Sequence, residues 1–306
     1  MIVNNQVKLA IITIIVTIPL ISFAVFSSDS NQSKKTNESK LQVMSSFYPL
    51  HEFAQKVGQD KVDVKLLVPV GIEPHDWEPT IKDVQQMQKS DLIIINGIGF
   101  ESWTNKLTEM NYQGIVVDTS NGIITKNIDE SSTNEHVDTS GDPHIWLNPV
   151  FAKIQVQNIA NAFSESDPEN QKYYEENAAK YIHELDLLDL KIRNELSNCN
   201  HDFISFHNAF SYFADEYDLT QHTILSSYVP HAEPTAQTLE NIINKAKDLN
   251  LKVIFTEETA DPKTSQVIAN EIGGKILVLS PLEIGDDGTY ISKMTENLNY
   301  LKEALC

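Results

Sequence analysis

Basic residues are few in this chain of 306 residues, and their shortage excludes one class of partner. The 23 lysine and arginine residues stand against 43 aspartates and glutamates, which leaves a formal net charge of -20. Proteins that bind nucleic acid carry a basic surface for the phosphate backbone, so we expect no nucleic-acid partner. An acidic surface instead favours solubility and attracts cations.

Cysteine is equally scarce, and the positions of the two cysteines exclude one kind of membrane anchor. The uncharged apolar segment at residues 9–26 has no cysteine directly after it, because the two cysteines are Cys199 and Cys306. A lipid anchor on a mature N-terminal cysteine is therefore excluded. The segment itself predicts export, with residues 1–26 forming a cleaved signal peptide or an N-terminal membrane anchor. In an oxidising compartment the two cysteines either form a disulfide or remain as free thiols, and the sequence leaves both outcomes open.

The hydrophobic pattern after residue 41 predicts an α/β protein. Residues 27–41 are rich in serine, asparagine and lysine, which predicts a flexible linker. Short apolar runs then alternate with helical patterns, which favours parallel sheets covered by helices on both faces. The predicted strands are 41–49, 62–69, 91–99, 114–120, 202–207, 252–257 and 275–281; the predicted helices are 51–59, 81–90, 208–218, 238–250 and 263–274.

A long helical stretch divides these elements into two groups. Apolar residues recur at steps of three and four from Tyr174 to Leu196, preceded by Asp167 and Pro168, a cap and a first-turn proline. The sequence therefore predicts two lobes, each with a mainly parallel sheet flanked by helices, joined by a single long backbone helix. We place the N-terminal α/β lobe at 42–150, the linking helical region at 151–199 and the C-terminal α/β lobe at 200–306, with a binding cleft between the lobes.

Three of the nine histidines stand in a setting that suits a binding site. His75 and His144 each follow a proline in a loop, and His207 ends a predicted strand. Proline restricts the backbone and holds an imidazole in place before binding, and imidazole is a common ligand of Zn²⁺ and other first-row ions. These three residues would supply three nitrogen ligands and need one more oxygen. The residues alone equally allow three unrelated loop histidines, because no local H-E-x-x-H motif is present.

The remaining histidines need no special role. His51, His183, His201 and His222 stand in helical or loop contexts beside polar residues, and we expect ordinary surface positions for them. His136 lies in residues 121–143, a stretch without periodicity that we interpret as a surface loop.

Seven sequence blocks between residues 47 and 298 resemble one family in order and spacing. They include LVPVGIEPHDWEPT, GDPHIWLNP and SFHNAFSYFADEYDL, and together they resemble the metal-binding solute-binding proteins of ABC importers for zinc and manganese. The resemblance implies a two-lobed fold joined by a helix, which captures a metal ion outside the cytoplasm and delivers it to a membrane permease.

The resemblance also implies a set of metal ligands. The three histidine positions of the family's motifs fall on His75, His144 and His207, and the L-x-P-L-E segment places the fourth ligand of zinc-type members on Glu283. Three nitrogens and one carboxylate form a zinc-like set. Some relatives use water in place of the glutamate, and Asp286 and Asp287 stand close to it. His231, in VPHAEPT, mimics the first motif, and we interpret it as a residue beside the site or as incidental.

The resulting functional hypothesis is high-affinity extracytoplasmic Zn²⁺ capture and delivery to an ABC permease transmembrane subunit, by a monomer that is not an enzyme. The protein would act at the cell surface or in a periplasm-like space, attached to the membrane through residues 9–26 if that segment is not cleaved. Alternatives are a Mn²⁺ or Fe²⁺ carrier of the same family, an adhesin, or a zinc hydrolase with Glu257 or Glu258 as its base.

Overall fold

The computed structural model describes residues 40–125, 141–230, 233–285 and 288–306. Within it, residues 40–306 form one compact unit. The predicted signal or anchor at 1–26, the predicted linker up to residue 39, and His136 and His231 lie outside the described residues. No helix in the described ranges is long and apolar enough to cross a membrane.

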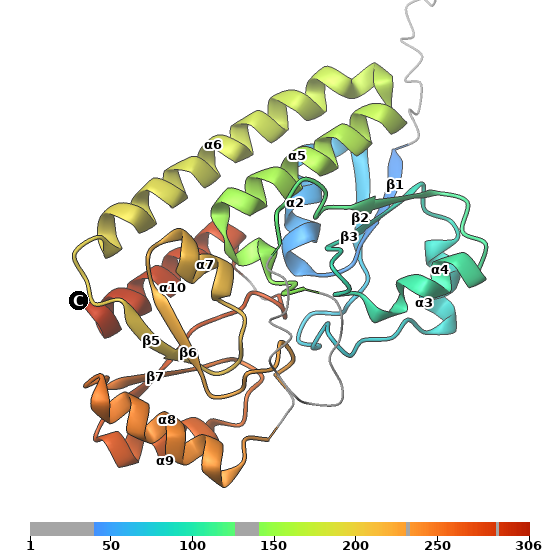
Figure 1. The fold of residues 1–306 in the computed structure, drawn as a ribbon. Helices are drawn as coiled ribbons and strands as arrows, with labels where there is room; N and C mark the ends of the chain where they lie inside the picture. The colour runs from blue at the N-terminus through green and yellow to red at the C-terminus, as the bar shows by residue number, and fades with distance from the viewer. Residues whose placement is uncertain (1–39, 126–140, 231–232, 286–287) are drawn as a thin grey trace, which may run out of the picture. The chain divides into compact units, whose positions relative to one another are not determined.

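The N-terminal half is built on a four-stranded parallel sheet with the strand order β2-β1-β3-β4 (Figure 1). Its strands are β1 Leu41–Ser45, β2 Val62–Leu66, β3 Leu92–Ile95 and β4 Ile115–Asp118. Its helices are α2 Tyr48–Gly58, the 3₁₀ helix Gln59–Lys61, α3 Ile81–Met87, the 3₁₀ helix Ser102–Thr104 and α4 Asn105–Glu109.

Alternate side chains of the central strands enter different cores, as a sheet covered on both faces requires. Leu92 and Ile94 of β3 join the large core with α2 and α5, whereas Ile93 and Ile95 pack with Trp103 and its neighbours on the other face. All four residues of β3 are buried, which explains its continuous apolar sequence.

Two long helices connect the halves of the molecule. They are α5 Pro149–Ser166 and α6 Gln171–Leu196, separated by the 3₁₀ helix Pro168–Asn170, and they lie side by side (Figure 1). Helix α6 has 26 residues and is the predicted long backbone helix. The whole predicted apolar stripe is buried: Tyr174, Ala178, Tyr181, Leu185, Leu188, Ile192 and Leu196.

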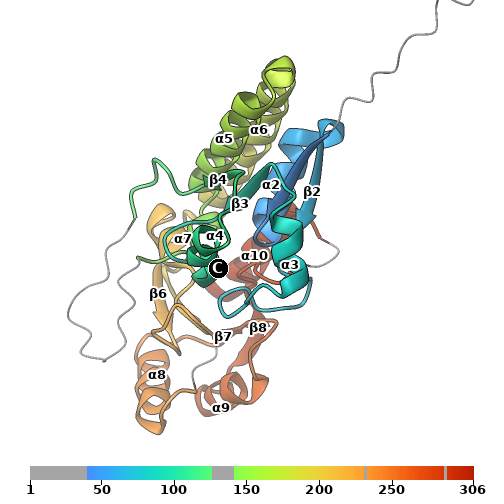
Figure 2. The same ribbon diagram turned by 90° about the vertical axis from the view of Figure 1, so that its right-hand side faces the viewer.

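The C-terminal half contains two pairs of parallel strands, β5–β6 and β7–β8, with β5 and β7 in contact. The strands are β5 Asp202–Ser205, β6 Thr220–Thr223, β7 Val253–Thr256 and β8 Lys275–Val278. The helices are α7 Ser211–Glu216, α8 Ala236–Asp248, α9 Pro262–Ile272 and α10 Tyr290–Leu305. Helices α8 and α9 lie together beyond these strands, whereas α10 packs against α6 (Figures 1 and 2).

The predicted α/β class, with parallel sheets flanked by helices and a long connecting helix, is confirmed. The predicted lobe boundaries at 150 and 200 stay predictions. The largest core is shared by both halves: Phe203 of β5 and Phe255 of β7 belong to the same buried cluster as Val43 of β1 and Leu188 of α6.

Several local predictions were wrong in extent or missed an element. The strand predicted over 41–49 ends at Ser45, because Pro49 favours the first turn of a helix that begins at Tyr48. The short strand β6 was missed because Thr220–Thr223 is polar, and His222 lies on it rather than in a helix or loop. Helix α10 was also missed, although Thr289 and Ser292 form a capping box at its start.

The two cysteines form a disulfide, which the sequence had left open. Cys199 follows the end of α6 and Cys306 follows α10, and the backbone N–H of Asn200 also donates to the carbonyl of Leu305. The C-terminus is thereby tied to the end of the long helix.

Candidate metal centre

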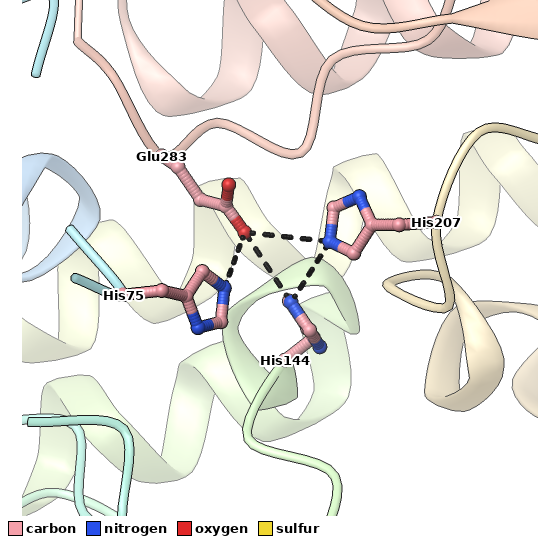
Figure 3. Close-up of side chains that lie close together, drawn as sticks. All are labelled: His75, His144, His207 and Glu283. Atoms are coloured by element: carbon pink, nitrogen blue, oxygen red, sulfur yellow. Dashed lines mark hydrogen bonds and ion pairs between the residues drawn. The ribbon is translucent and has the colours of Figure 1, made fainter. Parts of the chain in front are cut away.

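Four loops bring the predicted metal-ligand residues together. His75 lies in the loop after β2, His144 immediately before the 3₁₀ helix Ile145–Leu147, His207 just after β5, and Glu283 in the loop after β8. Three of these loops leave the carboxyl ends of parallel strands, where ligand sites of open α/β sheets are found. Figure 3 shows the four side chains converging on one point.

The donor atoms are close together and buried. His75 Nε2 and His144 Nε2 each lie 3.3 Å from Glu283 Oε1, and His207 Nε2 lies 3.8 Å from the same oxygen (Figure 3). His144 Nε2 and His207 Nε2 are 3.3 Å apart. The exposed fractions of these side chains are 6% for His75, 2% for Glu283 and zero for His144 and His207.

These distances fit a tetrahedral ion. A tetrahedron with metal–ligand bonds of about 2.0 to 2.1 Å has edges of about 3.3 to 3.4 Å. Three of the donor separations have that length, and all four ligand atoms lie within 4.8 Å of one another. Half of the six donor separations thus have the length expected for a four-coordinate Zn²⁺ site, and three imidazole nitrogens with one carboxylate oxygen are a ligand set that zinc accepts.

Two carboxylates fix the orientation of two histidine rings. Asp142 Oδ1 lies 2.7 Å from His144 Nδ1 and also accepts the backbone N–H of His144. Both carboxylate oxygens of Glu257 lie within 2.7 Å of His207 Nδ1, and Glu257 also accepts the backbone N–H of His207. With Nδ1 engaged in this way, Nε2 of each ring faces the centre, as in the carboxylate–histidine pairs that support metal ligands.

Sequence reasoning missed the orienting role of both carboxylates. Asp142 stands two residues before His144, and Pro143 between them restricts the turn, so a local signal for this pair was present. Glu257 is 50 residues from His207 in the sequence, and only the contact between β5 and β7 places the two together.

Burial and the neighbouring charges shift the pKa values of three of the predicted ligands. Burial lowers the pKa of His144, but the hydrogen bonds with Asp142 and Glu283 outweigh it and raise this pKa to about 9. Burial opposes ionisation of Glu283, but the neighbouring His75 and the hydrogen bonds from His144 and His75 hold its pKa below the usual range. The pKa of His75 is lowered by burial, against the opposing effect of Glu283.

Glu73 is a further acid beside the centre. One of its oxygens accepts the backbone N–H of His75, and burial followed by the charge of Glu283 raises the pKa of Glu73 to about 8. Glu78, in the same loop, instead forms an exposed ion pair with Lys106.

The other described histidines lie away from the centre. His183 is exposed on α6. His222 and His201 form hydrogen bonds within the β5–β6 region, with Asp202 and with the carbonyl of Asp218. His51 is partly buried on α2, where it contacts the hydroxyl of Ser45.

Comparison with known proteins gives consistent results. The chain matches the family described as "ZnuA: Zinc-uptake complex component A periplasmic" over residues 43–304. It is 38% identical to the "High-affinity zinc uptake system protein ZnuA" of Bacillus subtilis (strain 168) over 304 residues, which cover 94% of each chain.

Solved structures agree with these sequence matches. The metal-dependent lipoprotein YcdH from Bacillus subtilis has a TM-score of 0.76 at 38% identity, covering 87% of this chain and 99% of that one. The Zn(II)-bound ZnuA-like domain of Streptococcus pneumoniae AdcA has a TM-score of 0.74 at 32% identity, covering 87% and 98% of the two chains. With the family match and an identity of 38% spanning nearly the whole length, this chain belongs to the ZnuA family of zinc-uptake components.

Proposed function

We propose that the protein captures Zn²⁺ outside the cytoplasm with His75, His144, His207 and Glu283, and delivers it to the permease of an ABC transporter. The observation that carries the proposal is the buried set of three imidazole nitrogens and one carboxylate oxygen, which all lie within 4.8 Å of one another, with three of the separations at 3.3 Å. Zinc-binding relatives of the same family support the choice of ion. Imidazole-rich tetrahedral sets favour zinc, whereas harder ions such as Mn²⁺ favour oxygen ligands.

Isothermal titration calorimetry with Zn²⁺ and with Mn²⁺ tests the site. We expect one tight zinc site in the wild-type protein, weaker Mn²⁺ binding, and loss of the tight site in His144→Ala. His183→Ala is the matched control, since His183 is exposed on α6 and should bind zinc like the wild type. Undiminished zinc binding by His75→Ala and His207→Ala would contradict the ligand assignment.

The transport part of the proposal concerns a partner in the membrane. Zinc-limited growth of cells that depend on this protein should fail with Glu283→Gln and recover when zinc is abundant, because excess ion bypasses a high-affinity carrier. Equal growth of wild type and Glu283→Gln at every zinc concentration would count against delivery through this site. We also expect a monomer, to be measured by light scattering.

Catalysis is not part of the proposed function. A hydrolase would need a free general base beside the metal-bound water. Both oxygens of Glu257 instead face Nδ1 of His207, the ring nitrogen turned away from the other ligands. Ester hydrolysis by the zinc-loaded protein that disappears in Glu257→Gln would overturn this part.

The N-terminal segment completes the proposal. We infer from the apolar residues 9–26 that this segment directs export and either is removed or holds the protein at the membrane. Intact mass measurement of the protein recovered from its native cell distinguishes a mature chain that lacks residues 1–26 from a full-length anchored one.

A further inference from the structure

The loop that carries Glu283, residues 279–285, is held from two sides. Its first two residues are bound to the C-terminal half: the N–H of Leu279 donates to the carbonyl of Thr256 at 2.9 Å, and the N–H of Ser280 to Asn297 Oδ1 at 2.9 Å. Thr256 ends β7 and Asn297 lies on α10. The beginning of the loop is therefore bonded to the C-terminal half, to which it belongs in the sequence.

From Pro281 onward, the hydrogen-bond partners of the loop belong to the N-terminal half. Trp146 Nε1–H donates to the carbonyl of Pro281 at 2.7 Å, and the N–H of Gly71 donates to the carbonyl of Ile284 at 3.0 Å. Both donors belong to the N-terminal half, and their two hydrogen bonds flank Glu283 on either side. Gly285 also lies against α2, where a Cβ added to it would stand 2.9 Å from the ring of Tyr48.

The chain stays attached to the N-terminal half where α10 begins. The N–H of Tyr290 donates to Glu52 Oε2 at 2.6 Å, and the hydroxyl of Tyr290 donates to the carbonyl of Trp146 at 2.6 Å. Glu52 is buried on α2 and also accepts the hydroxyl of Tyr181 from α6. Trp146 thus contacts the chain before and after Glu283, at Pro281 and at Tyr290.

The backbone next to Glu283 adopts a conformation that needs such support. Leu282 has φ of 59° although it is not a glycine, and its side chain is buried. A left-handed conformation costs an ordinary residue about 1 to 2 kcal/mol, so it persists only where the surroundings over-determine it. The hydrogen bonds at Pro281 and Ile284 supply that constraint on both sides of Leu282 and Glu283.

We propose that Trp146 is a positioning residue that links two metal ligands, so that His144 and Glu283 are set relative to each other before the ion arrives. Trp146 stands two residues after His144, and its indole holds the carbonyl two residues before Glu283. Glu283 follows β8 in the sequence, but residues of the N-terminal half position its carboxylate. His75 and His144 belong to that same half. His207 differs, because its backbone and ring both bond to Glu257 of the C-terminal half.

The inference rests on the proposed zinc site and has its own test. Trp146→Phe keeps an aromatic ring in the core but removes the N–H that holds Pro281. Calorimetry should show zinc affinity reduced about tenfold, the range typical of groups that orient metal ligands. Visible spectra of the Co²⁺-loaded variant should show d–d bands shifted in position and shape from those of the wild type, because a water molecule that replaces Glu283 changes the ligand field of the four-coordinate site. Trp103→Phe is the matched control, since Trp103 is equally buried in the N-terminal half and lies outside the site.

A double-mutant cycle separates positioning from a general loss of stability. In a Glu283→Gln background, Trp146→Phe should cause no further loss of zinc affinity, because the group that it positions is already gone. Gly285→Ala pushes the loop away from Tyr48, so it should also reduce zinc affinity in the wild type and cause no further loss in the Glu283→Gln background. This variant tests the proposal if Trp146→Phe folds poorly.

The opposing outcomes are distinct. Wild-type zinc affinity in Trp146→Phe, full additivity of its effect with Glu283→Gln, or an equal loss in Trp103→Phe would overturn the positioning role. Failure of the wild-type protein to bind zinc, or an unchanged affinity in Glu283→Gln alone, would instead overturn the proposed function.

Discussion

At the scale of single residues, the centre depends on which ring nitrogen each histidine turns toward the ion. Asp142 and Glu257 engage Nδ1 of His144 and His207, leaving Nε2 for the metal. Such carboxylates also increase the basicity of the ring that they hold. Asp142 bonds to His144 and Glu257 to His207, so the effect of each acid on zinc passes through its histidine.

Glu257→Gln should weaken zinc binding without abolishing it. The amide can still accept the Nδ1–H of His207 but carries no charge, and we expect zinc affinity to fall about tenfold or more. Calorimetry at fixed pH measures the change. Glu258→Gln is the control, because Glu258 is the neighbouring, exposed acid and its side chain forms a hydrogen bond with Ser280. An equal loss in both variants would contradict an orienting role specific to Glu257.

Zinc binding should release a proton below about pH 9. The pKa of His144 is raised to about 9, so this imidazole is protonated near neutral pH in the metal-free protein and must lose its proton to bind zinc. Zinc affinity should therefore increase as the pH rises toward 9, a higher limit than the pKa of 6.5 of an ordinary histidine predicts. Calorimetry in buffers of different ionisation enthalpy counts the protons. No proton release at pH 7 to 8 would contradict the prediction.

The stability of the metal-free protein should decrease with rising pH, whereas zinc affinity should increase. Because the pKa of His144 in the folded state exceeds the value of 6.5, its protonation stabilises the fold fully below pH 6.5. This contribution is lost as the pH rises through about 9. Melting temperatures of the metal-free wild type should therefore fall from pH 6.5 to 9, and Asp142→Asn should reduce that dependence.

At the scale of secondary-structure elements, α6 and α10 form the support that joins the two halves. The apolar stripe of α6 is buried along its whole length, and α10 packs against it with Met294, Leu298 and Leu301 in the shared core. The disulfide closes the end of this pair. It lies at the C-terminal end of α10, whereas the loop that carries Glu283 precedes the N-terminal end of this helix at Tyr290.

Removing the disulfide should lower stability but leave the metal site intact. The bridge links residues 107 positions apart. For a loop of that length, chain entropy predicts a loss of about 4 to 5 kcal/mol of unfolding free energy in the double variant Cys199→Ser/Cys306→Ser. Urea titration measures this loss, and zinc calorimetry on the same variant is the control. A large fall in zinc affinity with little change in stability would show that the bridge acts on the site instead.

At the scale of the whole molecule, the two halves share one core, and the described residues 40–306 form one compact unit. The proposed zinc centre takes residues from both halves, so a bound ion would add a further link between them. A ligand that binds only the folded state stabilises it by mass action. Zinc should therefore act on the unfolding of the molecule as a unit.

Zinc at one hundred times its dissociation constant should raise the unfolding free energy by about 2.7 kcal/mol. All three tryptophans lie before residue 150, so their fluorescence reports the N-terminal half, whereas circular dichroism reports both. The two signals should change at the same denaturant concentration and shift together when zinc is added. Separate transitions, or a shift in only one signal, would show that the halves unfold independently.

Local patterns in the sequence were sufficient for most elements and singled out three histidines as candidate ligands, although the residues alone equally allowed three unrelated loop histidines. Strand and helix periodicity, the buried stripe of α6, and the proline-led turns at His75 and His144 are properties of neighbouring residues, so they could be predicted directly. Strand ends were less predictable, as at Ser45, where the helix that begins at Tyr48 ends the strand earlier than the apolar pattern indicates.

Long-range packing decided the rest. The residues alone did not choose Glu283 over the nearby acids or water; that choice came from family resemblance, and its carboxylate meets His75 across 208 positions of sequence only in the folded chain. The pairing of Glu257 with His207, the disulfide, and the hold of Trp146 on Pro281 likewise join distant segments. A donor separation of 3.3 Å is a property of how strands and loops from both halves pack, and no local pattern encodes it.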